Sequence, residues 1–199
     1  AKDTILHPTS GNVVVITGSG VSNSDPMLLK NLRVETMGLV GIDLRNTNFV
    51  RFENVQVAGD ATPHGENEMC LRVDKLVSVS DLTIVDSGFS QCDYGWYFFK
   101  SEVADWATGG TYVRNVAVAN TSFIENSYKG IYAEKLSDAS FVDCVVRDNG
   151  HYDFWNGVWN AGIDINLKGQ EMYKNLTFKN LYMAGNGLGA KEGAGLMVK

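Results

Sequence analysis

One short segment recurs along the chain and constrains the fold more than any other feature. It begins with glycine, or with cysteine in one copy, and then alternates apolar with polar residues: GIDLRN at 41–46, CLRVDK at 70–75, GWYFFK at 95–100, GIYAEK at 130–135, GIDINLK at 162–168 and GLMVK at 195–199. This alternation has the period of two that is typical of a β-strand, and helical periodicity is absent. We name these segments the Gly-strands. Their recurrence indicates a repeated structural unit.

A second motif accompanies the Gly-strands and consists of an Asn or Asp, a short β-branched run and a polar turn. Its copies begin at Asn31, Asn54, Asp81, Asn120, Asp143 and Asn180. The two-part repeat predicts a parallel β-helix, in which each unit forms one coil and equivalent strands stack on one another. An Asn or Asp at the same corner of every coil can bond the turn backbone and the equivalent side chain one coil away. An antiparallel sandwich would require hairpin turns at regular spacings of about 8–12 residues, and the repeat fits that pattern poorly.

The segment AGIDINLKG at 161–169 and the segment NLTFKNLYMAGNGLGAKEGAGLMVK at 175–199 carry a family resemblance. They resemble the right-handed parallel β-helix superfamily typified by pectate lyases, and in particular β-helix modules of large secreted or surface-attached bacterial proteins. The resemblance implies an all-β, right-handed, single-stranded parallel β-helix (a solenoid) of about six coils without substantial helix. Residues 27–199 carry the repeat, and residues 1–26 are expected to form an N-terminal capping coil. The resemblance does not define an activity, because the superfamily includes lyases, hydrolases, epimerases, adhesins and phage fibres.

Composition argues against two classes of partner and leaves the state of the cysteines open. The formal net charge of −6 argues against nucleic acid, which requires clustered Lys and Arg. No apolar run approaches the ~18 residues of a membrane span. The three cysteines, Cys70, Cys92 and Cys144, are an odd number without C-x-x-C spacing. We therefore expect mostly free thiols, with a Cys70–Cys92 disulfide as the alternative.

The alternation divides the residues of each Gly-strand into an inward and an outward set. The inward residues are all apolar: Ile42, Leu44, Leu71, Val73, Trp96, Phe98, Ile131, Ala133, Ile163, Ile165, Leu196 and Val198. The outward residues form two columns across the coils: Asp43, Arg72, Tyr97, Tyr132, Asp164 and Met197, beside Arg45, Asp74, Phe99, Glu134, Asn166 and Lys199. We call this outward surface the strip. Lysines lie just beyond it at Lys75, Lys100, Lys135 and Lys168.

The strip is predicted to bind a polysaccharide. Opposite charges in the first coils, such as Asp43 and Arg72, are expected of a solvated sheet, whereas exposed aromatic residues in the middle coils indicate a binding surface. Five coil steps of ~4.8 Å give a length of about 24 Å, which suits an oligosaccharide. The expected contacts are Tyr97, Phe99, Tyr132, Glu134, Asp164 and Asn166 on the strip, and Trp155 and Trp159 on a neighbouring loop.

Long connections are predicted to raise walls beside the strip. Residues 58–69, 85–94 and 148–160 each precede a Gly-strand, so they are expected to form one wall carrying His64, Glu66, Glu68, Asp93, Tyr94, His151, Asp153, Trp155 and Trp159. Residues 101–110 follow a Gly-strand and would place Trp106 on the opposite side. Function is often located on such loops, because a rigid scaffold positions them.

Among enzymatic reactions, β-elimination of an acidic polysaccharide fits these residues best. A lyase of this kind needs Ca²⁺ to neutralise the uronate and a basic residue to take a proton. Glu134, Asp153 and Asp164 are the candidate calcium ligands, and Lys135 or Lys168 is the candidate base.

Two other reactions are less favoured. Glycoside hydrolysis would use Glu134 and Asp164 as paired carboxylates, and epimerisation would use His151 or His64 for proton transfer. The flanking signatures of polygalacturonases and the residue order of epimerases are both missing. Whether the chain cleaves a polymer at all is left open by the sequence.

The sequence therefore predicts an extracellular, carbohydrate-directed module, secreted or at the cell surface. A non-catalytic structural or adhesive segment of a large surface protein is the alternative. The final GLMVK begins a strand without a corner motif or polar cap after it, so we expect further coils or another chain to cover this end.

Overall fold

A computed structural model describes residues 4–7, 11–100, 110–152, 159–169, 173–189 and 193–199, and the regular elements among them are all β-strands. One sheet contains β2 (Val14–Ile16) and the six Gly-strands, which are β4 (Val40–Leu44), β6 (Met69–Val73), β9 (Tyr94–Phe98), β12 (Lys129–Ala133), β15 (Ala161–Ile165) and β18 (Ala194–Val198). Within these described ranges, no helix has the length and apolar character that crossing a membrane would need.

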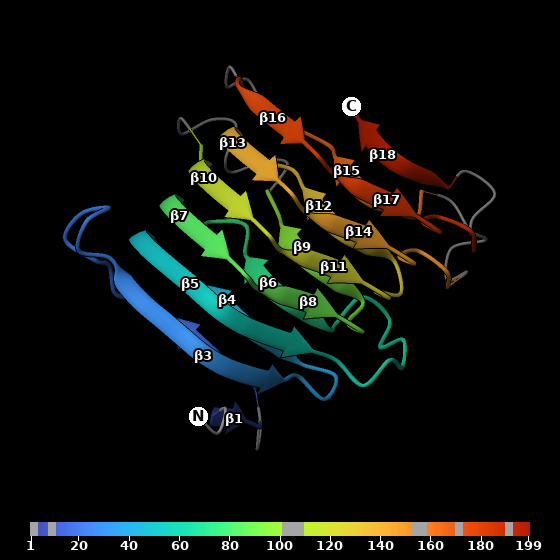
Figure 1. Cartoon of the computed structure of the whole chain (residues 1–199), viewed down its shortest axis with the longest axis horizontal. Coiled ribbons are helices and arrows are strands. Elements are labelled where there is room, and N and C mark those ends of the chain that lie inside the picture. Colours follow the sequence, from blue (N-terminus) through green and yellow to red (C-terminus); the bar gives the residue numbers. More distant parts are fainter. Residues whose placement is uncertain (1–3, 8–10, 101–109, 153–158, 170–172, 190–192) are drawn as a thin grey trace.

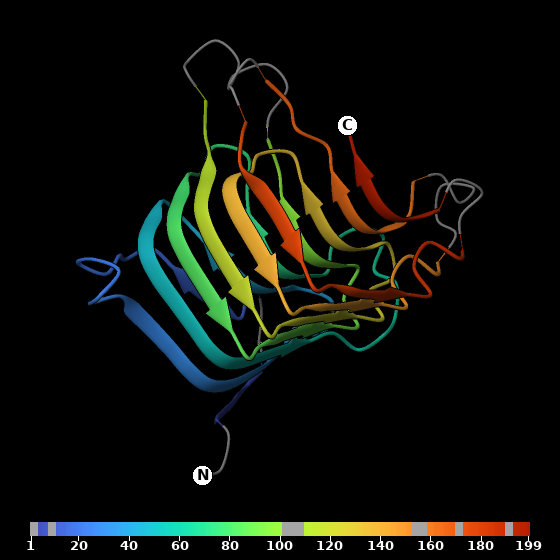
Figure 2. The ribbon, with the colours of Figure 1, turned by 45° about the horizontal axis from the view of Figure 1, so that its top comes forward.

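The second sheet has two arms. One arm contains β7 (Val79–Val85), β10 (Val113–Ala119), β13 (Ser137–Val142) and β16 (Leu176–Lys179). The other contains β8 (Gly88–Ser90), β11 (Ser122–Ile124), β14 (Val145–Arg147) and β17 (Tyr182–Ala184). The strand β5 (Thr47–Ala58) joins the arms, because its first half pairs with β7 and its second half with β8. Figure 2 shows β5 curving from one arm into the other. Next to it lies β3 (Met27–Glu35), which pairs with β1 (Thr4–Leu6).

Every strand pairing between coils is parallel. Each coil contributes to three faces: the sheet of Gly-strands and the two arms of the second sheet. The strands stack from the blue N-terminal end to the red C-terminal end in Figure 1, with the two termini at opposite ends of the stack. This architecture confirms the predicted parallel β-helix. Residues 4–6 and 14–16 each add a strand to the N-terminal end of the stack.

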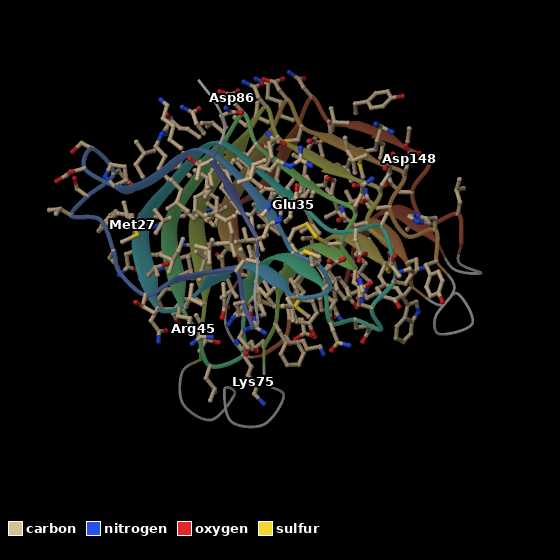
Figure 3. All side chains as sticks on the ribbon, turned by 90° about the horizontal axis from the view of Figure 1, so that it is seen from below. Met27, Glu35, Arg45, Lys75, Asp86 and Asp148 are labelled. Carbon is tan, nitrogen blue, oxygen red and sulfur yellow. A yellow bond between two sulfur atoms is a disulfide. The ribbon has the colours of Figure 1, made fainter. Side chains whose placement is uncertain are left out.

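The Gly-strands pair in the register that the repeated segments of the sequence predicted. Ile42, Leu71, Trp96, Ile131, Ile163 and Leu196 are paired in succession. The predicted inward residues of the first five Gly-strands are fully buried, and side chains fill the interior between the sheets (Figure 3). Leu196 and Val198 on β18 are 43% and 61% exposed, because β18 is the last strand in the order of its sheet.

The Asn and Asp residues of the second motif occupy corners with left-handed backbone. The six predicted copies have φ between 48° and 55°, a conformation that Asn and Asp adopt more readily than most residues. The side chains bond between coils as expected: Asn54 Nδ2 donates to Asn31 Oδ1 at 3.0 Å, and Asn180 Nδ2 to Asp143 Oδ1 at 3.0 Å.

The alignment of Asp81 with this corner is wrong. The pairing of β7 with β10 places Asp86, not Asp81, beside Asn120. Asp81 belongs to a second corner, where Asn115 Nδ2 donates to it at 3.2 Å. Both corners require a left-handed residue, so the sequence motif does not distinguish them. Figure 3 shows Asp86 on the opposite side of the molecule from Arg45 and Lys75, which follow the strands β4 and β6.

A buried ladder of asparagine side chains explains why the repeated strand begins with glycine. Asn126 Nδ2 donates to Asn149 Oδ1 at 2.8 Å, and Asn149 Nδ2 donates to Asn186 Oδ1 at 2.9 Å. A Cβ atom at Gly130 would lie 3.0 Å from Asn149 Nδ2 and 2.6 Å from the carbonyl oxygen of Gly162. The contact with the Gly162 carbonyl oxygen is too short for any side chain, so the backbone of the next coil and the ladder beside it together leave room only for glycine.

A disulfide replaces this arrangement in one coil. Cys70 occupies the glycine position of β6, since it lies between Met69 and Leu71, which pair with β9. Cys92 occupies the asparagine position, because its backbone N–H donates to Asn126 Oδ1 at 3.2 Å. The Cys70–Cys92 disulfide connects the two. The expectation of mostly free thiols was therefore wrong for this pair, whereas Cys144 is free and buried.

Candidate functional site

The outward column of the Gly-strands has the predicted register. Asp43, Arg72, Tyr97, Tyr132, Asp164 and Met197 are paired in succession across the coils. In the middle of the column the aromatic rings pack side by side. The ring centroids of Tyr97 and Tyr132 are 5.6 Å apart, and those of Tyr97 and Phe99 are 5.6 Å apart and stacked. The strip thus presents an aromatic surface at its centre, as the sequence indicated.

A pocket of about 400 Å³ lies at the edge of this aromatic surface. Its lining comes from two Gly-strands, β9 and β12, from the turn before β12 and from two connections, and consists of Glu66, Tyr94, Tyr97, Tyr128, Lys129, Tyr132, Trp159 and Asn160. Glu66 belongs to the connection between β5 and β6, and Trp159 and Asn160 to the connection between β14 and β15. Two of the three predicted wall segments therefore contribute loop residues to one pocket, which we call the tyrosine pocket.

The third predicted segment, residues 85–94, is not an extended loop. It contains the short strand β8 and the first residue of β9. Tyr94 consequently lies at the start of a Gly-strand, where its hydroxyl donates to Glu66 Oε1 at 2.8 Å. Its ring centroid is 4.9 Å from that of Tyr97, so Tyr94 connects the wall to the strip.

Lys129 places a positive charge inside the tyrosine pocket. Its Nζ lies 2.6 Å from Asp164 Oδ2 and 4.2 Å from the centroid of the Tyr132 ring. Burial lowers the pKa of Lys129, and the Asp164 carboxylate opposes this shift. Asp164 is buried, and its Oδ1 atom has no hydrogen-bond partner. The ion pair holds the ammonium group against the aromatic surface.

The tyrosines of the pocket stay protonated across the physiological range. Burial raises the pKa of Tyr97, and the nearby Glu134 carboxylate adds to the shift. Burial also raises the pKa of Tyr132, whose hydroxyl donates to Glu134 Oε1 at 2.6 Å. Burial also raises the pKa of Tyr94 well above its usual value. The pocket therefore offers apolar rings with neutral hydroxyl groups, beside one ammonium group and one carboxylate.

Glu134 lies in the second column, and both of its carboxylate oxygens have partners. Besides the Tyr132 hydroxyl, its Oε1 lies 2.6 Å from Lys168 Nζ, and its Oε2 accepts a hydrogen bond from the Lys100 backbone N–H at 2.8 Å. Asn166 Nδ2 reaches the Tyr132 hydroxyl at 3.4 Å. These contacts hold the Tyr132 hydroxyl and the Glu134 side chain in place on the strip.

Two of the three expected calcium ligands, Glu134 and Asp164, lie among the described residues. Glu134 already faces the Lys168 ammonium and Asp164 faces the Lys129 ammonium. A calcium ion would need six to eight oxygen ligands, and two carboxylates that each face a lysine do not fit that requirement. The third candidate, Asp153, lies outside the described residues, as do Trp155 and Trp106.

Two candidate catalytic residues lie away from the tyrosine pocket. Lys135 is fully buried, and its Nζ donates to the carbonyl oxygens of Asp74 at 2.8 Å and Val77 at 2.6 Å. It holds the turn after β6 from the interior of the β-helix. His151 is exposed, and its Nδ1 is 3.2 Å from the carbonyl oxygen of Asp148. By contrast, Trp159 lines the pocket as expected, and Lys199 Nζ lies 4.7 Å from its ring centroid.

Sequence reasoning missed Tyr128 and Lys129 in the pocket. Lys129 is the first residue of β12 and Tyr128 precedes it, so both come before the glycine that begins the repeated segment. Pairing of Lys129 with Tyr94 brings them beside the strip. In the structure each Gly-strand begins one residue before the glycine or cysteine of its repeated segment. The repeat as read from the sequence therefore left out the position that Lys129 occupies.

The tyrosine pocket therefore lies on a scaffold whose coils run parallel and whose glycine and asparagine positions repeat. The chain matches the family described as "Right handed beta helix region" over residues 12–198. Neither the curated proteins nor the solved structures include a match to this sequence. Because the family match covers nearly the whole chain, the protein belongs to the right-handed β-helix family.

Proposed function

We propose that this β-helix is an extracellular carbohydrate-binding module that holds a polysaccharide along the strip, with one sugar residue in the tyrosine pocket. The observation that carries the proposal is the pocket itself, in which four tyrosines and a tryptophan surround Lys129 and Glu66. Aromatic rings pack against the apolar faces of sugars, and buried polar tips fix orientation. The pocket volume of about 400 Å³ suits a single ring of a longer chain.

The charges of the pocket support a sugar that carries its own charge. Lys129 offers an ammonium group at the pocket wall, and Glu66 offers a carboxylate that accepts from the Tyr94 hydroxyl. An acidic sugar would approach Lys129 and an amino sugar would approach Glu66. Uronate polymers and amino-sugar polymers are therefore the first candidates to test.

Secretion is supported by the Cys70–Cys92 disulfide. Disulfides form and persist in oxidising compartments and are rare in the cytosol. An extracellular location also agrees with a polymeric ligand outside the cell.

We favour binding over β-elimination because the candidate bases are committed elsewhere. Lys135 is buried against backbone carbonyls, and Lys168 is paired with Glu134. Elimination needs a base that can reach the substrate proton in an unprotonated state.

The binding test uses a panel of neutral, uronate and amino-sugar polysaccharides, with affinity measured by isothermal titration calorimetry. Tyr97→Ala and Tyr132→Ala should each weaken binding by about tenfold, since truncation of a central aromatic anchor removes more than 1 kcal/mol of binding energy. Tyr182→Ala is the matched control, because Tyr182 is 61% exposed on β17. Affinities that Tyr97→Ala and Tyr132→Ala leave unchanged would refute the pocket.

The same samples decide between binding, cleavage and a structural role. The absorbance of unsaturated sugar products is followed with and without a chelator. Product formation lost on chelation would establish a calcium-dependent lyase and overturn our preference for binding alone. Retained binding without product supports the module, whereas no binding to any polymer favours the structural or adhesive alternative.

A further inference from the structure

The connection between β5 and β6, residues 59–68, carries a second group of polar side chains besides Glu66. Asp60, His64 and Glu68 each contribute one donor atom, and these atoms all lie within 4.8 Å of one another. His64 Nε2 is 3.0 Å from Asp60 Oδ1. Imidazole nitrogen and carboxylate oxygen are both ligands of divalent transition metals.

Glu68 is the residue that points to a ligand. Its side chain is fully buried, and its Oε1 accepts hydrogen bonds from the Thr36 hydroxyl and from the Gly38 backbone N–H at 2.6 Å. Its Oε2 is buried without any hydrogen-bond partner. A buried carboxylate oxygen without a partner costs free energy, and native structures contain few of them. A bound cation would supply the missing partner.

Two glycines leave room for these side chains. A Cβ atom at Gly59 would lie 2.4 Å from Glu68 Oε2. At Gly38, whose φ is +82°, a Cβ atom would lie 3.0 Å from the His64 ring. At Gly59 a Cβ atom would also meet the Gln91 carbonyl oxygen at 2.0 Å, and the positive φ of Gly38 disfavours a side chain there. Both glycines therefore keep the space beside Glu68 and His64 open.

Asp93 fixes the loop that carries His64 and Glu68. Its Oδ1 accepts from the His64 backbone N–H at 3.0 Å, and its Oδ2 accepts from the backbone N–H groups of Asn67 at 3.0 Å and Glu68 at 3.2 Å. The loop is thus held to the next coil through three hydrogen bonds to one carboxylate. Preorganisation of this kind is what a metal site requires of its supporting residues.

The group is also accessible from solvent. Asp60 is exposed and lines a shallow depression of about 320 Å³ together with Arg33, Glu35 and Gln91. An ion can therefore approach the group from solvent at Asp60, and a metal site needs such an approach.

We propose that Asp60, His64 and Glu68 bind a divalent transition-metal ion, with Zn²⁺ as the best match. Two carboxylates and a neutral imidazole balance the charge of the ion and leave a fourth position open, as in three-ligand zinc sites. Zinc bonds of about 2.0–2.2 Å place tetrahedral ligands about 3.4 Å apart. The three donor atoms now lie within 4.8 Å of one another, so they would move closer together on binding. Calcium is a poorer match, because it binds oxygen ligands and not imidazole.

The test uses the full chain after chelator treatment and dialysis, titrated with Zn²⁺ by calorimetry and with Co²⁺ by visible absorption. Binding of one equivalent, with a cobalt spectrum of low coordination number and a raised unfolding temperature, is the expected result. His64→Ala and Asp60→Asn should each weaken binding by at least about tenfold. His151→Ala is the matched control, since His151 is an exposed loop histidine, and it should leave the affinity unchanged.

Several outcomes would overturn the site. These are the absence of binding by either metal, an affinity that His64→Ala leaves intact, and an affinity that His151→Ala abolishes. Asp60 is exposed, so Asp60→Asn retains the fold and gives a result even where a substitution of the buried Glu68 does not. None of these measurements involves a sugar, so the metal site and the carbohydrate proposal fail independently.

Discussion

At the scale of single residues, Lys129 shows how the strip combines a charge with an apolar surface. The ammonium group lies against the Tyr132 ring and the Asp164 carboxylate, and its side chain is only 12% exposed. Burial of a charged amine costs free energy unless a partner is close. Asp164 therefore determines how much of the charge of Lys129 persists as the pH rises.

Asp164→Asn should lower the pKa of Lys129 further below its position in the native protein. Burial already lowers this pKa, and the carboxylate is the main influence that raises it again. The charged form of the amine is populated below its pKa, so the variant should lose the charge at a lower pH than the native chain does. A pH titration of ¹³C-labelled lysine side chains by NMR measures the change.

Asp43→Asn is the control for this titration. Asp43 lies in the same column as Asp164, but Arg72, Tyr97 and Tyr132 separate the two. Its substitution should leave the Lys129 titration in place. Equal midpoints for Lys129 in the native chain and in Asp164→Asn would contradict the ion pair.

Lys135 shows where residue-level prediction ends. The alternation that placed Tyr97, Tyr132 and Asp164 correctly holds only while the chain is extended. The strand β12 ends at Ala133, so the direction of a side chain two residues later depends on the turn and not on the period of two. That turn directs Lys135 into the interior, where backbone carbonyls receive its ammonium group.

At the scale of elements, the repeated glycines and the asparagine ladder lie side by side and form one structural feature. Each ladder asparagine lies six residues after a corner residue: Asn126 after Asn120, Asn149 after Asp143, and Asn186 after Asn180. The spacing is visible in the sequence, so the ladder could have been predicted once the corners were aligned. The misplacement of Asp81 hid it, because Cys92 lies six residues after Asp86.

Asn149→Ala should lower the free energy of unfolding by about 2–4 kcal/mol. The Asn149 side chain is fully buried and bonds Asn126, Asn186 and the Phe123 carbonyl oxygen. Its removal takes hydrogen-bond partners away from the buried Asn126 and from the half-buried Asn186 on the two neighbouring coils. Urea unfolding followed by circular dichroism provides the measurement.

Asn180→Ala is the control for the ladder. Asn180 is exposed at an outer corner and has φ of 53°, so alanine there should cost only about 1 kcal/mol through backbone strain. A loss for Asn149→Ala no larger than the loss for Asn180→Ala would contradict a stabilising role of the ladder.

At the scale of the whole molecule, the scaffold was more predictable than the site. Register and core residues follow from the period of two, because the inward residues of every Gly-strand are apolar and a slip of one residue would expose them. The tyrosine pocket depends on Glu66 and Trp159, which lie about 90 residues apart in the sequence on separate connections. No local pattern specifies how two such connections meet, so the pocket required the structure.

The Cys70–Cys92 disulfide joins residues 22 positions apart and should stabilise the β-helix by about 3 kcal/mol through the entropy of the unfolded chain. Its loss in Cys70→Ala/Cys92→Ala should lower the unfolding temperature by about 6–12 °C. Reductant should act similarly on the native chain and on Cys144→Ala, and should have no effect on the double variant.

The double substitution Cys70→Gly/Cys92→Asn tests whether the disulfide replaces a glycine–asparagine pair. Asn126 Nδ2 donates to the Phe89 carbonyl oxygen at 3.2 Å, and Val57 pairs with Phe89 one coil earlier. The amide introduced at position 92 should therefore donate to the carbonyl oxygen of Val57 and extend the ladder by one coil. The variant should unfold at a higher temperature than Cys70→Ala/Cys92→Ala, although glycine loses more chain entropy than alanine on folding. An unfolding temperature at or below that of the alanine pair would show that the ladder ends at Asn126 for a reason other than the disulfide.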